Sequence, residues 1–120
     1  MAIRGIRGAT TVGIDHPDQI ITDTQELLEV ISHSNPGLRT EDIASAFFTT
    51  TSDLVSTHPA LAARQMGWTL VPMMCAVEIP VPGSLPRCVR VLIHWNTESD
   101  QKDIRHIYLH DATKLRPDLR

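Results

Sequence analysis

Arg90 lies in the middle of an apolar stretch, residues 85–97, and its side chain stays charged at any physiological pH. Alternate residues of this stretch are β-branched, a pattern typical of a strand: Val89, Val91 and Ile93. Arg90 then shares the opposite face of the strand with Leu92 and His94. An unpaired guanidinium buried in such a strand would cost several kcal/mol. We therefore expect Arg90 to meet a carboxylate, either of this protein or of a ligand.

Glu78 is a natural partner for that cation, because it is the only acidic residue between Asp53 and Glu98. It lies in the run Cys-Ala-Val-Glu-Ile and suits either Arg90 or a hydroxyl group on a ligand. Strict strand alternation puts Cys75 and Glu78 on opposite faces. Both reach one site only if a bulge separates them, which the prolines on either side of the run favour.

Nine of the eleven basic residues are arginines, whose planar guanidinium suits bidentate binding of carboxylates. This bias is consistent with a site for a small, multiply charged anion, and equally with chance. Arg7 stands in a predicted first strand and Arg64 on a short, alanine-rich helix. Each of them is also explained as a solvated surface cation.

Histidines near the C-terminus raise the question of a metal. His106, Tyr108 and His110 share one face of a predicted last strand, but no third ligand is evident, so we expect no metal. The sequence also lacks a GxSxG motif, a Cys–His signature and a phosphate-binding loop. What remains is an arginine-rich pocket with one carboxylate and one tyrosine, which can bind a dianion and stabilise developing charge without a cofactor.

Length and composition indicate an ordinary globular domain. The chain has 120 residues, a formal net charge of −3 and a pI near 6.0, which argue against a nucleic-acid partner. No apolar run approaches the roughly 20 residues of a membrane span, and the N-terminus has no apolar signal segment. Cys75 and Cys88 are expected to be reduced thiols of a cytoplasmic protein.

The elements that must position these residues follow a simple order. Strands are predicted over residues 2–12, 43–51, 68–79, 85–97 and 104–110. Helices are predicted from Pro17 to the stop at Asn35 and from Ala60 to Met66, with a helical turn at residues 40–42. The order β-α-β-α-β-β-β predicts an α+β protein, with one mixed five-stranded sheet and helices on one face.

Residues 1–120 are expected to form a single domain, in which residues 111–120 are a mobile C-terminal tail. The sheet face without helices favours a homo-oligomer, because other subunits would cover it.

Four segments, in the same order and over nearly the whole chain, carry a resemblance to a known family. They are residues 4–12 (RGIRGATTV), 71–78 (VPMMCAVE), 88–91 (CVRV) and 105–119, in which RHIYL precedes LRPDL. In these segments the chain resembles the AroH class of monofunctional chorismate mutases. The resemblance implies a homotrimer with a central pseudo-α/β barrel and active sites between subunits. It also implies the Claisen rearrangement of chorismate to prephenate, in the shikimate route to phenylalanine and tyrosine, with no cofactor.

The resemblance also assigns roles to individual residues. Arg90 would donate to the ether oxygen, where negative charge builds as the C–O bond breaks. Arg7 and Tyr108 would hold a carboxylate, and Glu78, with Cys75 beside it, would accept from the ring hydroxyl. The remaining residues would recruit the dianion or line the pocket: Arg64 at the mouth, Arg116 on a closing tail, and Met73, Met74, Ala60 and Leu115 along the walls.

This chain departs from some relatives at His58, Leu61 and Met74, so a cation at the start of the second helix is absent. Two other functions stay open at this point. One is a trimeric deaminase of small imino acids, which would also place an arginine between subunits. The other is a non-catalytic sensor of a carboxylated metabolite.

Overall fold

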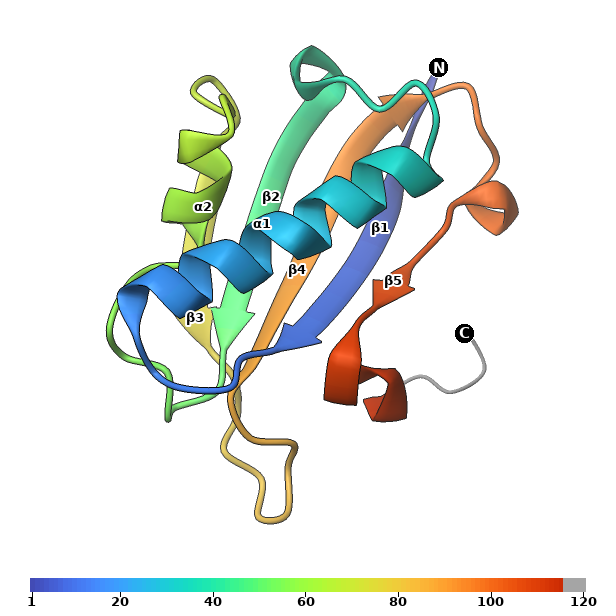
Figure 1. The fold of residues 1–120 in the computed structure, drawn as a ribbon. Helices are drawn as coiled ribbons and strands as arrows, with labels where there is room; N and C mark the ends of the chain where they lie inside the picture. Colours follow the sequence, from blue (N-terminus) through green and yellow to red (C-terminus); the bar gives the residue numbers. More distant parts are fainter. Residues whose placement is uncertain (116–120) are drawn as a thin grey trace.

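The computed structural model describes residues 1–115, and its strands form one mixed sheet in the order β3-β2-β4-β1-β5 (Figure 1). The strands are β1 (Ala2–Thr11), β2 (Ile43–Thr50), β3 (Met73–Val77), β4 (Cys88–Thr97) and β5 (Ile107–Tyr108). Strand β4 runs antiparallel to both β1 and β2, whereas β3 and β5 pair in parallel at the two edges. The predicted α+β class, with a single mixed five-stranded sheet, is confirmed.

Two α-helices, α1 (Pro17–Ser34) and α2 (Ala60–Gln65), lie on one face of the sheet (Figure 1). Short 3₁₀-helices occur in the connections and after the last strand: η1 (Thr40–Asp42), η2 (Gln101–Asp103) and η3 (His110–Leu115). Both α-helices contribute to one core cluster, α1 with Leu27, Leu28 and Ile31 and α2 with Ala60 and Ala63.

The ends of α1 are defined by specific side chains. The Nδ1 atom of His16, the N-cap residue, accepts a hydrogen bond from the Asp18 N–H at 3.2 Å. Pro17 occupies the first turn, where its missing N–H needs no partner. At the other end the buried Asn35 side chain donates to the Ile31 carbonyl at 2.9 Å. The helix therefore spans the sheet with a fixed start and stop.

Gly8 allows α1 to approach β1 closely. It lies on the helix-covered face, and a Cβ atom there would stand 2.7 Å from Ile31 Cδ1 and 3.2 Å from Val91 Cγ1. Glycines in the first strand predict close approach of a backbone or ligand. The structure assigns that approach at Gly8 to side chains of α1 and β4.

Strand β3 is shorter than the predicted span of residues 68–79. Residue Gly67 has a φ of 97°, in the left-handed region that favours glycine, and the Trp68 N–H still bonds the Ala63 carbonyl at 3.0 Å. The first residues of the predicted strand therefore belong to the turn that follows α2. Pairing with β2 starts only at Met73, directly after Pro72.

Strand β5 is also shorter than predicted. Before it, the Asn35 side chain accepts from the Arg105 N–H at 2.9 Å and donates to the Arg105 carbonyl at 3.0 Å, so these groups are not free for a strand ladder. After it, His110 has a φ of 54° and begins η3. The prediction that His106, Tyr108 and His110 share one strand face was therefore wrong.

The sheet face opposite α1, here called the open face, carries large apolar side chains in contact with solvent. Phe47, Met74 and Leu92 are 41%, 66% and 37% exposed. Within residues 1–115, no helix is long and apolar enough to cross a membrane.

Candidate active site

Strand register brings chemically capable side chains together on the open face. Thr49 of β2 pairs with Arg90 of β4, and Arg90 pairs in turn with Ala9 of β1. Ala9 then pairs with Tyr108 of β5, so one row of residues crosses four strands. The neighbouring row on the same face consists of Arg7, Leu92 and Phe47.

A cavity of about 380 Å³ lies over these two rows. Five residues that the sequence singles out line it: Arg7, Glu78, Arg90, Tyr108 and Leu115. Two permanent cations, one carboxylate and one phenol thus share a space large enough for a small ring carrying two carboxylates. We call it the arginine cavity.

Glu78 is held in place by β2. It directly follows β3, and its N–H donates to the Thr50 carbonyl at 2.9 Å. Its carboxylate accepts a short hydrogen bond from the Thr49 hydroxyl. Thr49 and Phe47 were not predicted as site residues. Strand alternation puts the two on one face, but only the pairing of β2 with β4 shows that this is the face of Arg90.

Arg90 lies on the middle strand of the sheet, as expected, but the expectation that it is buried was wrong for the single chain. Its side chain is exposed, and no carboxylate of residues 1–115 lies within ion-pair distance of it. The charge of Arg90 affects the pKa of the nearby Cys88, which lies two residues earlier in β4. Burial raises the pKa of the Cys88 thiol, and the Arg90 guanidinium partly offsets that rise.

Arg7 is positioned through its backbone. The Arg7 N–H donates to His106 Nδ1 at 2.9 Å, beside the point where β5 joins β1. His106 therefore has a structural contact next to the arginine cavity. Among the described residues, no group of three His, Cys, Asp or Glu side chains could hold a metal ion.

A second cavity, of about 400 Å³, lies between α2 and the edge strand β3. Four more of the predicted site residues line it: Ala60, Arg64, Met73 and Cys75. His58, one of the departures from some relatives, also lines it. We call it the α2–β3 cavity.

Cys75 does not lie beside Glu78. The pairing of β2 with β3 is regular from Met73 to Val77, so no bulge interrupts the alternation. Cys75 is therefore on the face of the core residue Phe48, and Glu78 is on the face of Thr49. Within one chain, the predicted site residues divide between two cavities on opposite faces of the sheet.

Met74 is not among the residues that line either cavity. Met74 lies on the open face, paired with Phe47. Arg116 lies outside the described residues. The first part of the predicted tail, residues 111–115, belongs to η3.

The fold is α+β, and the arginine cavity combines two cations, a carboxylate and a phenol, a set of groups suited to a small dianion. Comparisons with known proteins identify the family. The family model for chorismate mutase type I matches residues 3–119. This chain therefore belongs to the type I chorismate mutase family.

Individual relatives match this chain over nearly its full length. Chorismate mutase AroH of Thermus thermophilus is 51% identical over 117 residues, which cover 98% of this chain and 96% of the relative. Chorismate mutase AroH of Bacillus subtilis is 43% identical over 120 residues, covering 99% and 94%. A solved structure, chorismate mutase from Clostridium thermocellum, superimposes with a TM-score of 0.89 at 51% identity, covering 92% of this chain and 97% of that one. The deaminase and sensor alternatives are disfavoured by these matches.

Proposed function

We propose that this chain catalyses the rearrangement of chorismate to prephenate in the arginine cavity, and that it does so in the cytoplasm, where the free thiols of Cys75 and Cys88 are stable. The observation that carries the proposal is the meeting of Arg7, Arg90 and Glu78 in one cavity on the open face. The product would supply the synthesis of phenylalanine and tyrosine.

Arg90 would act on the breaking bond. In the rearrangement, negative charge grows on the ether oxygen as the C–O bond lengthens, and a guanidinium aimed at that oxygen stabilises the transition state more than the substrate. The absence of an ion-pair partner within residues 1–115 supports this role, because the charge of Arg90 is not already neutralised. By analogy with oxyanion donors, such a group contributes about 3–4 kcal/mol.

The other groups of the arginine cavity would hold the reactive shape of the substrate. Arg7 and Tyr108 would bind a carboxylate, and Glu78 would accept a hydrogen bond from the ring hydroxyl. Because the reaction is unimolecular, holding a compact conformer lowers the entropic part of the barrier without a covalent intermediate. No proton transfer is needed, so we expect activity in EDTA and little pH dependence through neutrality.

The active site would be completed by a second copy of the chain. Arg64 and Ala60 line the α2–β3 cavity, on the other face of the sheet from Arg90, so a single chain cannot bring them to the same substrate. Docking the α2–β3 side of one copy against the open face of another would join the two cavities. It would also cover exposed apolar side chains at the edge strand, among them Val77 at 66% and Ile79 at 80% exposure.

Such an interface joins two different patches, so it is head-to-tail, and it forms a closed ring when the rotation between copies is a whole fraction of a turn. The family resemblance implies three copies, with three equivalent sites around a barrel. Arg90, exposed in the single chain, would then be enclosed between two subunits. Arg116 would reach the same site from the C-terminal segment.

The direct test follows the absorbance of chorismate after adding purified protein in the presence of EDTA, with product identification and a measurement of mass in solution. Loss of chorismate with formation of prephenate by a trimer supports the proposal. A protein that binds chorismate without consuming it would be a sensor. Release of ammonia from small imino acids, with chorismate untouched, would indicate the deaminase.

A further inference from the structure

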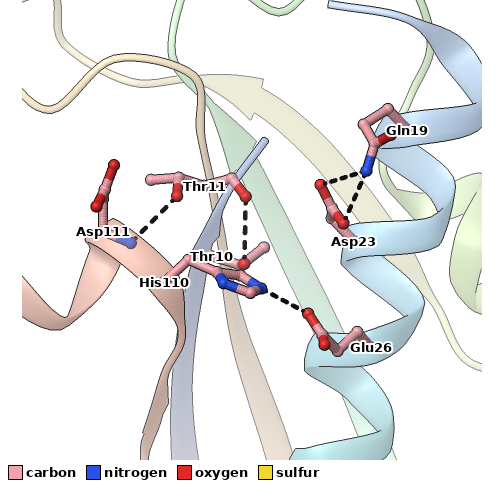
Figure 2. A network of polar contacts seen from close by, with 7 residues as sticks. All are labelled: Thr10, Thr11, Gln19, Asp23, Glu26, His110 and Asp111. Carbon is pink, nitrogen blue, oxygen red and sulfur yellow. Dashed lines mark hydrogen bonds and ion pairs between the residues drawn. The ribbon is translucent and has the colours of Figure 1, made fainter. Parts of the chain in front are cut away.

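His110 and Glu26 form a contact between two segments far apart in the sequence. The Nε2 atom of His110 lies 2.8 Å from Oε1 of Glu26, in the middle of α1 (Figure 2). Both side chains are about half exposed, and 84 residues separate them. The sequence predicts a strand at His110 and offers no signal that would connect this residue to Glu26.

The pair stands where the chain leaves the sheet. The Leu109 N–H still bonds the Ala9 carbonyl at 2.9 Å, and His110 is the next residue. Its φ of 54° turns the chain out of the strand direction. Asp111 then donates its N–H to the Thr11 hydroxyl at 3.3 Å (Figure 2). His110 is thus the pivot between β5 and η3.

Beyond this pivot, η3 folds onto the open face. Ala112 is fully buried against Ala9 and Cys88, which both have open-face positions in their strands. Tyr108 and Leu115 pack against this cluster from either end of the segment, and both line the arginine cavity. His110 contacts α1 on the opposite side of the sheet, so the segment from His110 to Leu115 wraps around the sheet edge.

We propose that His110 and Glu26 are positioning residues, which hold η3 against the sheet edge so that Tyr108 and Leu115 form a wall of the substrate site. The proposal rests on the substrate site assigned above. Neither residue lines the arginine cavity, so each would act through η3.

The charged groups around the pair come from α1 and η3. On α1, Asp23 and Glu29 lie one turn to either side of Glu26, and Asp23 accepts from Gln19 (Figure 2). On η3, Asp111 pairs with Lys114 at 4.0 Å. The adjacent β1 residues Thr10 and Thr11 carry no charge. The contact between α1 and η3 is therefore made by Glu26 and His110, and not by these neighbouring charges.

The test compares His110→Ala, His110→Gln and Glu26→Gln with the parent, using chorismate as substrate. Alanine removes the hydrogen-bonding ring, whereas glutamine keeps a side-chain N–H donor. Lys114→Ala is the matched control, because it removes a cation of η3 that pairs within η3 alone. Amide hydrogen exchange of residues 110–115 in the unliganded protein reports η3 independently of activity.

We expect His110→Ala to raise KM roughly twofold to fivefold, the range of an exposed ion pair, with kcat less affected. Exchange in η3 accelerates in the same variant and not in Lys114→Ala. His110→Gln, which keeps a side-chain donor, restores KM toward the parent value.

Unchanged exchange in His110→Ala overturns the proposal, whatever happens to KM. Faster exchange with an unchanged KM also overturns it, because η3 would then be released without effect on the substrate. That second result is distinct from failure of the proposed function, in which the parent protein itself does not consume chorismate.

Discussion

Thr49 holds Glu78: its hydroxyl donates a short hydrogen bond to the carboxylate, from the neighbouring strand. Thr49 is also the register partner of Arg90 on its other side. One threonine thus stands between the carboxylate and the central cation of the arginine cavity. This arrangement orients Glu78 without any ion pair within 4 Å between Glu78 and Arg90.

Thr49→Val removes this hydrogen bond while keeping the shape of the side chain. We expect kcat/KM for chorismate to fall roughly tenfold, since a hydrogen bond to a charged group contributes about 1.5–3 kcal/mol. Thr49→Ser keeps the hydroxyl and is expected to retain most of the activity. Equal activity of the valine and serine variants would show that orientation of Glu78 by Thr49 is unimportant. Steady-state kinetics decide between the two.

Arg90→Ala is expected to lower kcat about 10²–10³-fold, the range measured for removal of one donor to a developing oxyanion. Because Arg90 makes no ion pair in residues 1–115, its removal leaves none of the described carboxylates without a partner, and the melting temperature should change little. Arg39→Ala is a suitable control, since Arg39 is an exposed arginine paired with Glu41 at 2.7 Å, away from both cavities. Near-normal turnover of the Arg90 variant would remove this residue from the mechanism.

Mixing two inactive variants tests whether the site spans two subunits. Arg90→Ala impairs the arginine cavity, and Arg64→Ala impairs the α2–β3 cavity. After unfolding and refolding of an equimolar mixture, random assembly into trimers would leave about one quarter of the sites with both arginines. Activity well above that of either variant refolded alone is therefore expected. If each site used arginines of one chain only, mixing would restore nothing.

Gly8→Ala tests the close packing of α1 on β1. The new Cβ would stand 2.7 Å from Ile31 Cδ1 in a fully buried region, so we expect a loss of about 1–3 kcal/mol in the free energy of unfolding. Gly13→Ala is the control, because no atom lies within 4 Å of the added methyl. Combining Gly8→Ala with Ile31→Val removes the clashing methyl group. In denaturant unfolding, the double variant should recover part of the lost free energy of unfolding. If it recovers none, contact with Ile31 is not the cause of the loss.

Much of the fold could be predicted because its signals are local. The alternation in β4 and the helical spacing in α1 each occur within one segment, and both elements form as expected. One of the errors concerns a strand end that a distant group determines. Asn35, far away in the sequence, takes the hydrogen bonds of Arg105, and this shortens β5.

The class of chemistry follows from residue types, since arginines, one glutamate and one tyrosine in family-like segments indicate stabilisation of an anion. Which residues share a face of each strand also follows from local order, because a strand repeats every two residues. The separation of Cys75 and Arg64 from Arg90, and the contact of His110 with Glu26, became evident from the folded chain. Both results depend on strand order and on packing between segments far apart in the chain, which no local pattern encodes.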